Sequence, residues 1–113
     1  MATASNSWGP RANVVTENPL SNMVVLEALS GLESELGAAL ADLTRLSRNQ
    51  VGCLRYDCFQ SEETSGRFML VMQWQDERSL QAHLDSEHIV AFFLYTAKKL
   101  APGFLEEDYR SFS

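Results

Sequence analysis

Residues 67–74, RFMLVMQW, carry apolar side chains in both of the alternating sets that a β-strand presents. One set is Phe68, Leu70, Met72 and Trp74, and the other contains Met69 and Val71. A strand that is apolar on both sides is covered on both sides, so this segment predicts a central strand. Other segments of the chain must therefore cover one face of the sheet, and the other face must also be buried against something.

The segments around this strand predict an antiparallel sheet. Residues 53–59, CLRYDCF, precede it across the polar turn at 61–66, which is typical of a hairpin. Residues 23–29, MVVLEAL, are β-branched and apolar and stop at Ser-Gly, so they predict a first strand. The segment 104–112, FLEEDYRSF, predicts a final strand at an edge of the sheet, with charges largely on one side.

Helical spacing appears twice between these strands. A leucine stripe predicts a helix from Leu32 to about Ser47, and Ser30 with Glu33 predicts a capping box at its start. Asp76 is placed to cap a short helix over 77–84. Ser86 is placed to cap a second one, with apolar spacing that continues to Leu100 before Pro-Gly at 102–103.

The resulting order, βαββαβ, predicts an α+β fold of the ferredoxin-like kind, with an antiparallel sheet and both helical crossovers on one side. At 113 residues the chain holds one such domain, at 23–113, after an N-terminal extension at 1–22. Helices on one side leave the other sheet face apolar. We therefore expect a homodimer in which two sheets pack face to face.

Charge and composition exclude several classes of function. Nine Lys and Arg against fifteen Asp and Glu give a net charge of −6, so we expect neither nucleic acid nor a membrane surface as partner. The sequence has neither a leader pattern nor an apolar run of about 20 residues, which predicts a cytoplasmic protein. Cys53 and Cys58 are expected on opposite faces of one strand, as reduced thiols without a disulfide or a closed metal site.

Three segments together, VGCLRYD, RFMLVMQW and SLQAHLDSEH, resemble the antibiotic biosynthesis monooxygenase family over roughly residues 23–112. The resemblance implies a dimeric α/β barrel. For the oxygenase branch it implies a reaction without metal or flavin, because an electron-rich phenol or hydroquinone supplies the electrons for O₂ itself. The expected function is thus a cofactor-independent monooxygenase of a small aromatic quinol, with the aromatic molecule and O₂ as its partners.

The resemblance also implies two site residues. Trp74 matches a Trp that forms a pocket wall for a flat ligand, although a large residue at a strand end is equally typical of a core. His83 matches the family's helix histidine and is the first candidate for proton transfer, with His88 second. A structural role for His88 at the helix break is the alternative. The actinorhodin-type oxygenases carry Asn where this chain has Leu70, which departs from their pattern.

Further candidates come from the residues themselves. Glu27 is a lone carboxylate in an apolar strand and could be a base, with Arg55 as its partner, or the two could form a structural polar cluster. Tyr56, Phe92 and Tyr95 could line an aromatic pocket between the sheet and the second helical segment, or could be plain core.

Three other functions stay open. A noncatalytic ligand-binding or stress-response dimer needs the same pocket without turnover. A sugar-phosphate isomerase would need a phosphate site, for which the sequence offers no Gly-rich helix start or convergent basic cluster. Haem-degrading relatives pair a helix His with a Trp and an Asn on the first strand. Here Trp74 and His83 match, but Asn22 is expected just before that strand.

Overall fold

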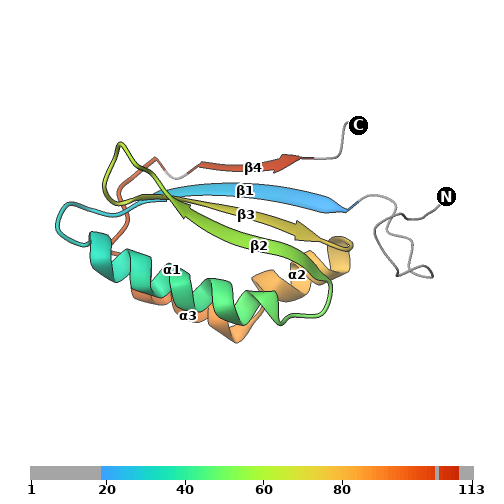
Figure 1. The fold of residues 1–113 in the computed structure, drawn as a ribbon. Coiled ribbons are helices and arrows are strands. Elements are labelled where there is room, and N and C mark those ends of the chain that lie inside the picture. The colour runs from blue at the N-terminus through green and yellow to red at the C-terminus, as the bar shows by residue number, and fades with distance from the viewer. Residues whose placement is uncertain (1–18, 104, 110–113) are drawn as a thin grey trace.

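The computed structural model describes residues 19–103 and 105–109, which form an antiparallel sheet with helices over one face (Figure 1). The strands are β1 (Leu20–Glu27), β2 (Cys53–Gln60), β3 (Arg67–Trp74) and β4 (Leu105–Tyr109). The helices are α1 (Glu33–Arg48), α2 (Glu77–Leu84) and α3 (Glu87–Thr96). The strands lie in the order β2-β3-β1-β4, so β3 is central and β4 is an edge. The ferredoxin-like α+β fold is confirmed.

The strand register divides the sheet residues between two faces. β1 pairs with β3 from Leu20 opposite Trp74 to Glu27 opposite Arg67, and directly opposed residues share a face. The face under the helices is closely packed. Its apolar strand residues are the most buried ones: Val24, Leu26, Tyr56, Phe68, Leu70, Met72 and Trp74. The other face, which we call the open face, holds half-buried apolar side chains: Met23, Val25, Met69 and Val71.

The first strand begins three residues earlier than the sequence predicts. Leu20 pairs with β3 alone, whereas Ser21 and Asn22 pair with both β3 and β4. These three residues of the expected extension therefore belong to the sheet. The strand also ends at Glu27, two residues before the predicted end. The prediction from local composition was wrong at both ends of β1, because pairing with the two neighbouring strands decides where this strand starts and ends.

The start of α1 differs from the predicted capping box. Leu32 occupies the N-cap position and makes no side-chain cap bond. Gly31 has φ 91°, a left-handed turn that takes Ser30 out of the cap position. The Glu33 carboxylate instead accepts a hydrogen bond of 3.0 Å from the Gly31 N–H. The predicted capping box is therefore wrong, although the predicted helix is present.

The two later caps are confirmed. The Asp76 carboxylate accepts from the Ser79 N–H at 2.8 Å at the start of α2, and the Ser86 hydroxyl accepts from the Ile89 N–H at the start of α3. α3 ends at Thr96, however, so Leu100 is outside the helix and forms a β-bridge with Ala28. Helical spacing beyond Thr96 was a chance continuation of the pattern.

A β-bulge changes the phase of β2. Cys53 lies opposite Trp74 and Arg55 opposite Gln73, so Leu54 is an extra residue. Cys53 and Cys58 consequently face the same side, and both pack against the core as free thiols. The expectation of opposite faces is wrong, because regular alternation does not pass through a bulge.

Among the helices of the described ranges, none has the length and apolar character needed to cross a membrane.

Candidate functional site

Three rings meet between the sheet and the helices near the end of β3. Tyr56 comes from β2, Trp74 ends β3, and His83 lies in the last turn of α2. The ring centroids of Trp74 and His83 are 4.7 Å apart, and those of Tyr56 and His83 are 5.3 Å apart. Each residue is at most 1% exposed. We call these three residues the aromatic cluster.

The local sequence explains how His83 reaches Trp74. Asp76 starts α2 directly after the strand ends, and His83 follows about two helical turns later. Leu80, three residues earlier on the same helix face, packs against the core. His83 therefore points inward with Leu80 and lies over the indole.

Gln50, in the turn between α1 and β2, joins the cluster to the second histidine. Its side-chain oxygen lies 2.7 Å from His83 Nδ1 and 3.0 Å from His88 Nε2. Because a carboxamide oxygen only accepts hydrogen bonds, both imidazoles donate to it. The Nε2 of His83 is then the unprotonated nitrogen, and the Tyr56 hydroxyl, 3.4 Å away, donates to it. A single acceptor thus fixes the tautomers of both histidines.

Burial keeps the cluster neutral. It lowers the pKa of His83 to about 4, and the neighbouring His88 lowers it further in the same direction. Burial also raises the pKa of Tyr56. At neutral pH the cluster therefore holds an uncharged imidazole and a protonated phenol. His83 can accept and pass hydrogen bonds, but it does not store a positive charge.

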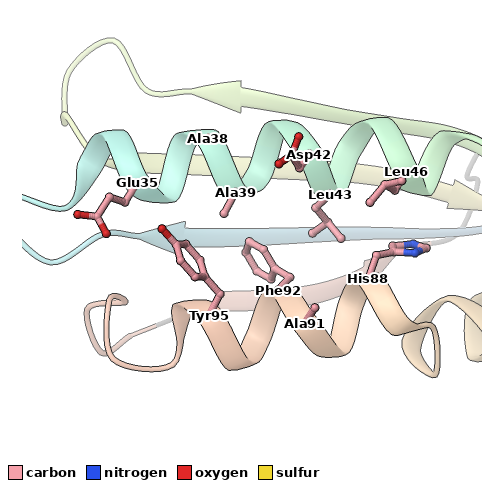
Figure 2. A pocket seen from close by; sticks show the side chains of 10 residues that line it. All are labelled: Glu35, Ala38, Ala39, Asp42, Leu43, Leu46, His88, Ala91, Phe92 and Tyr95. Carbon is pink, nitrogen blue, oxygen red and sulfur yellow. The ribbon is translucent and has the colours of Figure 1, made fainter.

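A groove lies between α1 and α3 (Figure 2). Its cavity volume is about 330 Å³, within the range of small-ligand sites. We call it the α1/α3 groove. Its lining residues come from the two helices: Glu35, Ala38, Ala39, Asp42, Leu43, Leu46, His88, Ala91, Phe92 and Tyr95. The groove brings together three predicted ligand-contacting residues, His88, Phe92 and Tyr95.

The position of this groove differs from the prediction. The sequence predicted a pocket between sheet and helix that Tyr56 would share with Phe92 and Tyr95. The structure instead buries Tyr56 beneath the helices and places Phe92 and Tyr95 on the groove between them. Gln50 is the link between the two places, since it bonds both His83 in the cluster and His88 in the groove.

The indole of Trp74 contributes an unused donor. Its Nε1–H is buried and has no hydrogen-bond partner within the described part of the chain. A buried donor without a partner costs free energy, so such groups call for an explanation. An oxygen atom of a ligand would satisfy it. The predicted role of Trp74 as a ligand wall stays a prediction.

Glu27 and Arg55 lie away from the cluster. Glu27 accepts from Arg67 at 3.0 Å, and Arg55 donates to Asp57 at 2.6 Å. The expected pair of Glu27 with Arg55 is wrong, because β3 separates their strands and places Arg67 directly opposite Glu27. Glu27 is on the open face of the sheet, whereas His83 is under the helices.

Asn22, unlike Glu27 and Arg55, lies on the same face of the sheet as the aromatic cluster. It lies inside β1, is 5% exposed, and is on the helix-covered face opposite Met72. Its side-chain amide donates to the Asp108 carboxylate of β4. The expectation that Asn22 precedes the first strand is wrong, because the strand starts at Leu20. The first strand therefore does carry an Asn on the face of Trp74.

Sequence reasoning missed Gln50 and misplaced Asn22. Gln50 is a polar residue in a turn, and no spacing rule separates it from any exposed glutamine. Asn22 could have been found from the register, since a strand that pairs along the whole of β3 must reach the residue opposite Trp74. Within the described ranges no group of three or more His, Cys, Asp or Glu side chains is arranged to hold a metal ion.

The family model described as antibiotic biosynthesis monooxygenase matches residues 19–94, more than half of the 113 residues. The chain belongs to the antibiotic biosynthesis monooxygenase family. The resemblance carried by the three sequence segments is thereby confirmed. The match starts at the residue before β1, in agreement with the strand boundary in the structure.

Solved structures share the fold of this family member. PA3566 from Pseudomonas aeruginosa is 26% identical, with a TM-score of 0.82 over 87% of this chain and 98% of that chain. SO0527 from Shewanella oneidensis is 23% identical, with a TM-score of 0.79 over 84% and 92%. A structure named antibiotic biosynthesis monooxygenase is 17% identical, with a TM-score of 0.79 over 83% and 99%. No curated protein matches the chain.

Proposed function

We propose that this protein is a cofactor-independent monooxygenase of a small phenol or quinol, which binds in the α1/α3 groove. The observation that supports it best is His88. This residue lines an aromatic groove while its Nε2–H is held by Gln50, so its Nδ1 keeps the lone pair that takes the substrate proton. Family membership supports the same type of reaction.

The reaction balances with O₂ as the only oxidant. A phenol gives its proton to His88, and the phenolate passes one electron to O₂. The phenoxyl radical and superoxide then form a C–O bond, and His88 returns the proton to give a hydroperoxide. Cleavage of the O–O bond releases water as the ring carbon loses its hydrogen, so phenol and O₂ become quinone and water. The protein contributes a base and a fixed orientation.

His83 has a supporting role in this proposal. It is fully buried, and its pKa of about 4 makes it a poor store for the substrate proton at neutral pH. It donates to Gln50 and accepts from Tyr56, so it holds the carboxamide that orients His88. We therefore assign proton uptake to His88 and the positioning of Gln50 to His83.

Oxygen uptake tests the proposal. The metal-stripped protein is presented with a panel of quinols and anthrones, and uptake is compared with the spontaneous rate. The His88→Gln variant should lose about 100-fold or more of the enzymatic rate, a typical loss for a general base. Ala82→Gln, on an exposed site of α2, is the matched control and should keep full rate. Uptake that is unchanged in His88→Gln would contradict the assignment, and a bound quinol without uptake would favour a noncatalytic ligand-binding dimer.

Asn22 supports haem degradation as a second candidate function. Its place on β1 completes the set of strand Asn, strand Trp and helix His that the resemblance associates with haem-degrading relatives. Titration with hemin should then produce an intense visible absorption band that weakens in Asn22→Ala. A quinol oxygenase without haem affinity would give oxygen uptake and no such band, so the two experiments separate the candidates.

We further propose that the protein is a homodimer joined through the open face. Met69 and Val71 of β3 lie opposite Val25 and Met23 of β1, so four apolar side chains adjoin on this face. Such a surface is typical of an interface. Light scattering should give twice the mass of the chain, and Val71→Lys should shift the protein to a monomer, because it would bury unpaired charges. A monomeric wild-type protein would contradict the proposal.

A further inference from the structure

A second groove runs along the opposite flank of α1, between this helix and β2. Its cavity volume is about 590 Å³, larger than that of the α1/α3 groove. We call it the α1/β2 groove. One end is lined by Gly37, Ala41 and Phe68, with Gln60 opposite Phe68, and the other end by Arg45 and Arg48. From position 37 to position 48 the helix rises about 16 Å, so the groove suits a long, narrow ligand.

The charge of this groove is opposite to that of the rest of the chain. Two arginines line it and no Asp or Glu does, whereas the whole chain carries a net charge of −6. The α1/α3 groove is lined by Glu35 and Asp42 and by no Lys or Arg. The two flanks of one helix therefore select ligands of different charge, and the α1/β2 groove favours an anion.

The two arginines lie about one helical turn apart on α1, and each already contacts an aspartate of this chain. Arg48 is held in place, since its Nε donates to the Tyr56 carbonyl at 2.8 Å and one Nη donates to Asp57 at 3.1 Å. Its other Nη group has no bond of this kind in the described ranges. Arg45 contacts Asp42 only at 3.5 Å between highly exposed side chains, a weak pairing that it can leave. Guanidinium groups are suited to planar carboxylates.

Thr44 gives an independent sign of a missing partner. Its side chain lines the groove, the residue is 7% exposed, and its hydroxyl has no hydrogen-bond partner in the described part of the chain. A buried helical threonine ordinarily bonds the carbonyl four residues earlier, as Thr96 does with Phe92 at 2.8 Å. The Thr44 hydroxyl does not, so it remains available to an oxygen atom in the groove.

We propose that the α1/β2 groove binds a medium-chain alkyl carboxylate, with the carboxylate at Arg45 and Arg48 and the alkyl chain toward Phe68. The proposal does not depend on the monooxygenase activity, since the α1/α3 groove lies on the other side of the helix. It assigns the protein a second ligand, which is long, singly charged and apolar at one end.

Titration with octanoate tests this site, with octylammonium as a probe of equal length and opposite charge. Backbone amide resonances of the ¹⁵N-labelled protein report where each probe binds. Octanoate should shift Thr44, Cys58 and Phe68 in a saturable manner, and octylammonium should not. Because the net charge of −6 attracts the cation and repels the anion, this preference requires a local cationic site. Equal shifts by both probes, or octanoate shifts confined to the α1/α3 groove, would overturn the proposal.

Variants locate the two ends of the ligand. Arg45→Gln should weaken octanoate binding about tenfold, the loss expected for a charge-assisted hydrogen bond. Ala41→Leu should abolish binding by filling the groove at an exposed helix position. The matched controls are Arg78→Gln on α2 and Ala38→Leu on the other flank of α1, and both should leave octanoate affinity unchanged. Thr44→Val, which keeps the side-chain volume, should weaken binding without lowering the melting temperature. Unchanged affinity in both Arg45→Gln and Ala41→Leu would exclude the site.

Discussion

The two faces of the sheet handle polar groups in opposite ways. Under the helices, His83, Tyr56 and Gln50 are neutral and bond one another, and burial shifts the pKa of both His83 and Tyr56 toward the uncharged form. On the open face, Glu27 and Arg67 remain charged neighbours with substantial exposure. The stability that the buried hydrogen bonds provide depends on their geometry. The attraction between the exposed charges of Glu27 and Arg67 is instead weakened by water.

The largest difference in stability between the two faces should come from the removal of a large apolar side chain. Trp74→Ala removes a fully buried ring and should lower the free energy of unfolding by about 3 to 5 kcal/mol. Met69→Ala on the open face should cost a monomer about 1 kcal/mol, since the side chain is only half-buried. Urea unfolding of both variants measures the contrast. A Met69→Ala loss as large as that of Trp74→Ala would show that a partner covers the open face.

Acid should weaken the covered face through His83. The pKa of this residue is lowered to about 4 in the folded protein, so between pH 6.5 and 4 the unfolded chain binds more protons than the folded one. Stability is then present above pH 6.5 and falls as the pH drops toward 4, by about 2 to 3 kcal/mol. Unfolding measured against pH should show this extra loss relative to His83→Gln. Parallel curves for the two proteins would contradict the buried neutral imidazole.

Removal of the shared acceptor should have a smaller effect. Gln50→Leu leaves the His83 Nδ1–H without a partner and should cost about 1 to 2 kcal/mol. The ring ¹⁵N shifts of His83 should change from one fixed tautomer to a mixture. Gln81→Leu is the control, because Gln81 bonds only the exposed Asp85. A His83 spectrum that stays the same in Gln50→Leu would mean that Tyr56 alone fixes the tautomer.

The smallest effect is expected on the open face. Glu27→Gln weakens a pair whose side chains are 38% and 50% exposed, and should change the free energy of unfolding by less than about 1 kcal/mol. Added salt should reduce the difference further. Unfolding at two salt concentrations measures it. A loss of several kcal/mol that persists in salt would place this pair inside an interface.

The fold could be predicted from the sequence because its main signals are local or strictly periodic. The alternation in residues 67–74 identified the central strand, and the caps Asp76 and Ser86 placed the starts of α2 and α3. The site could be predicted only in part. His83, Trp74 and Tyr56 do meet, but nothing local to residue 50 marks it as their link. The pairings of Glu27 and Asn22 depend on strand order and register, which are decided by packing across the whole sheet.

The extra residue in β2 has a consequence for how this chain tolerates length changes. A strand that kept Leu54 without the bulge would turn either Cys53 or Tyr56 to the outer side, because an odd number of steps separates them. Loss of Leu54 itself would leave two steps between Cys53 and Tyr56, so the strand would become regular and both side chains would stay under the helices. An added residue in the solvent-exposed turn at 62–63 would also leave every side chain on its own side. This hairpin can therefore accept one lost residue at its bulge and one added residue at its turn.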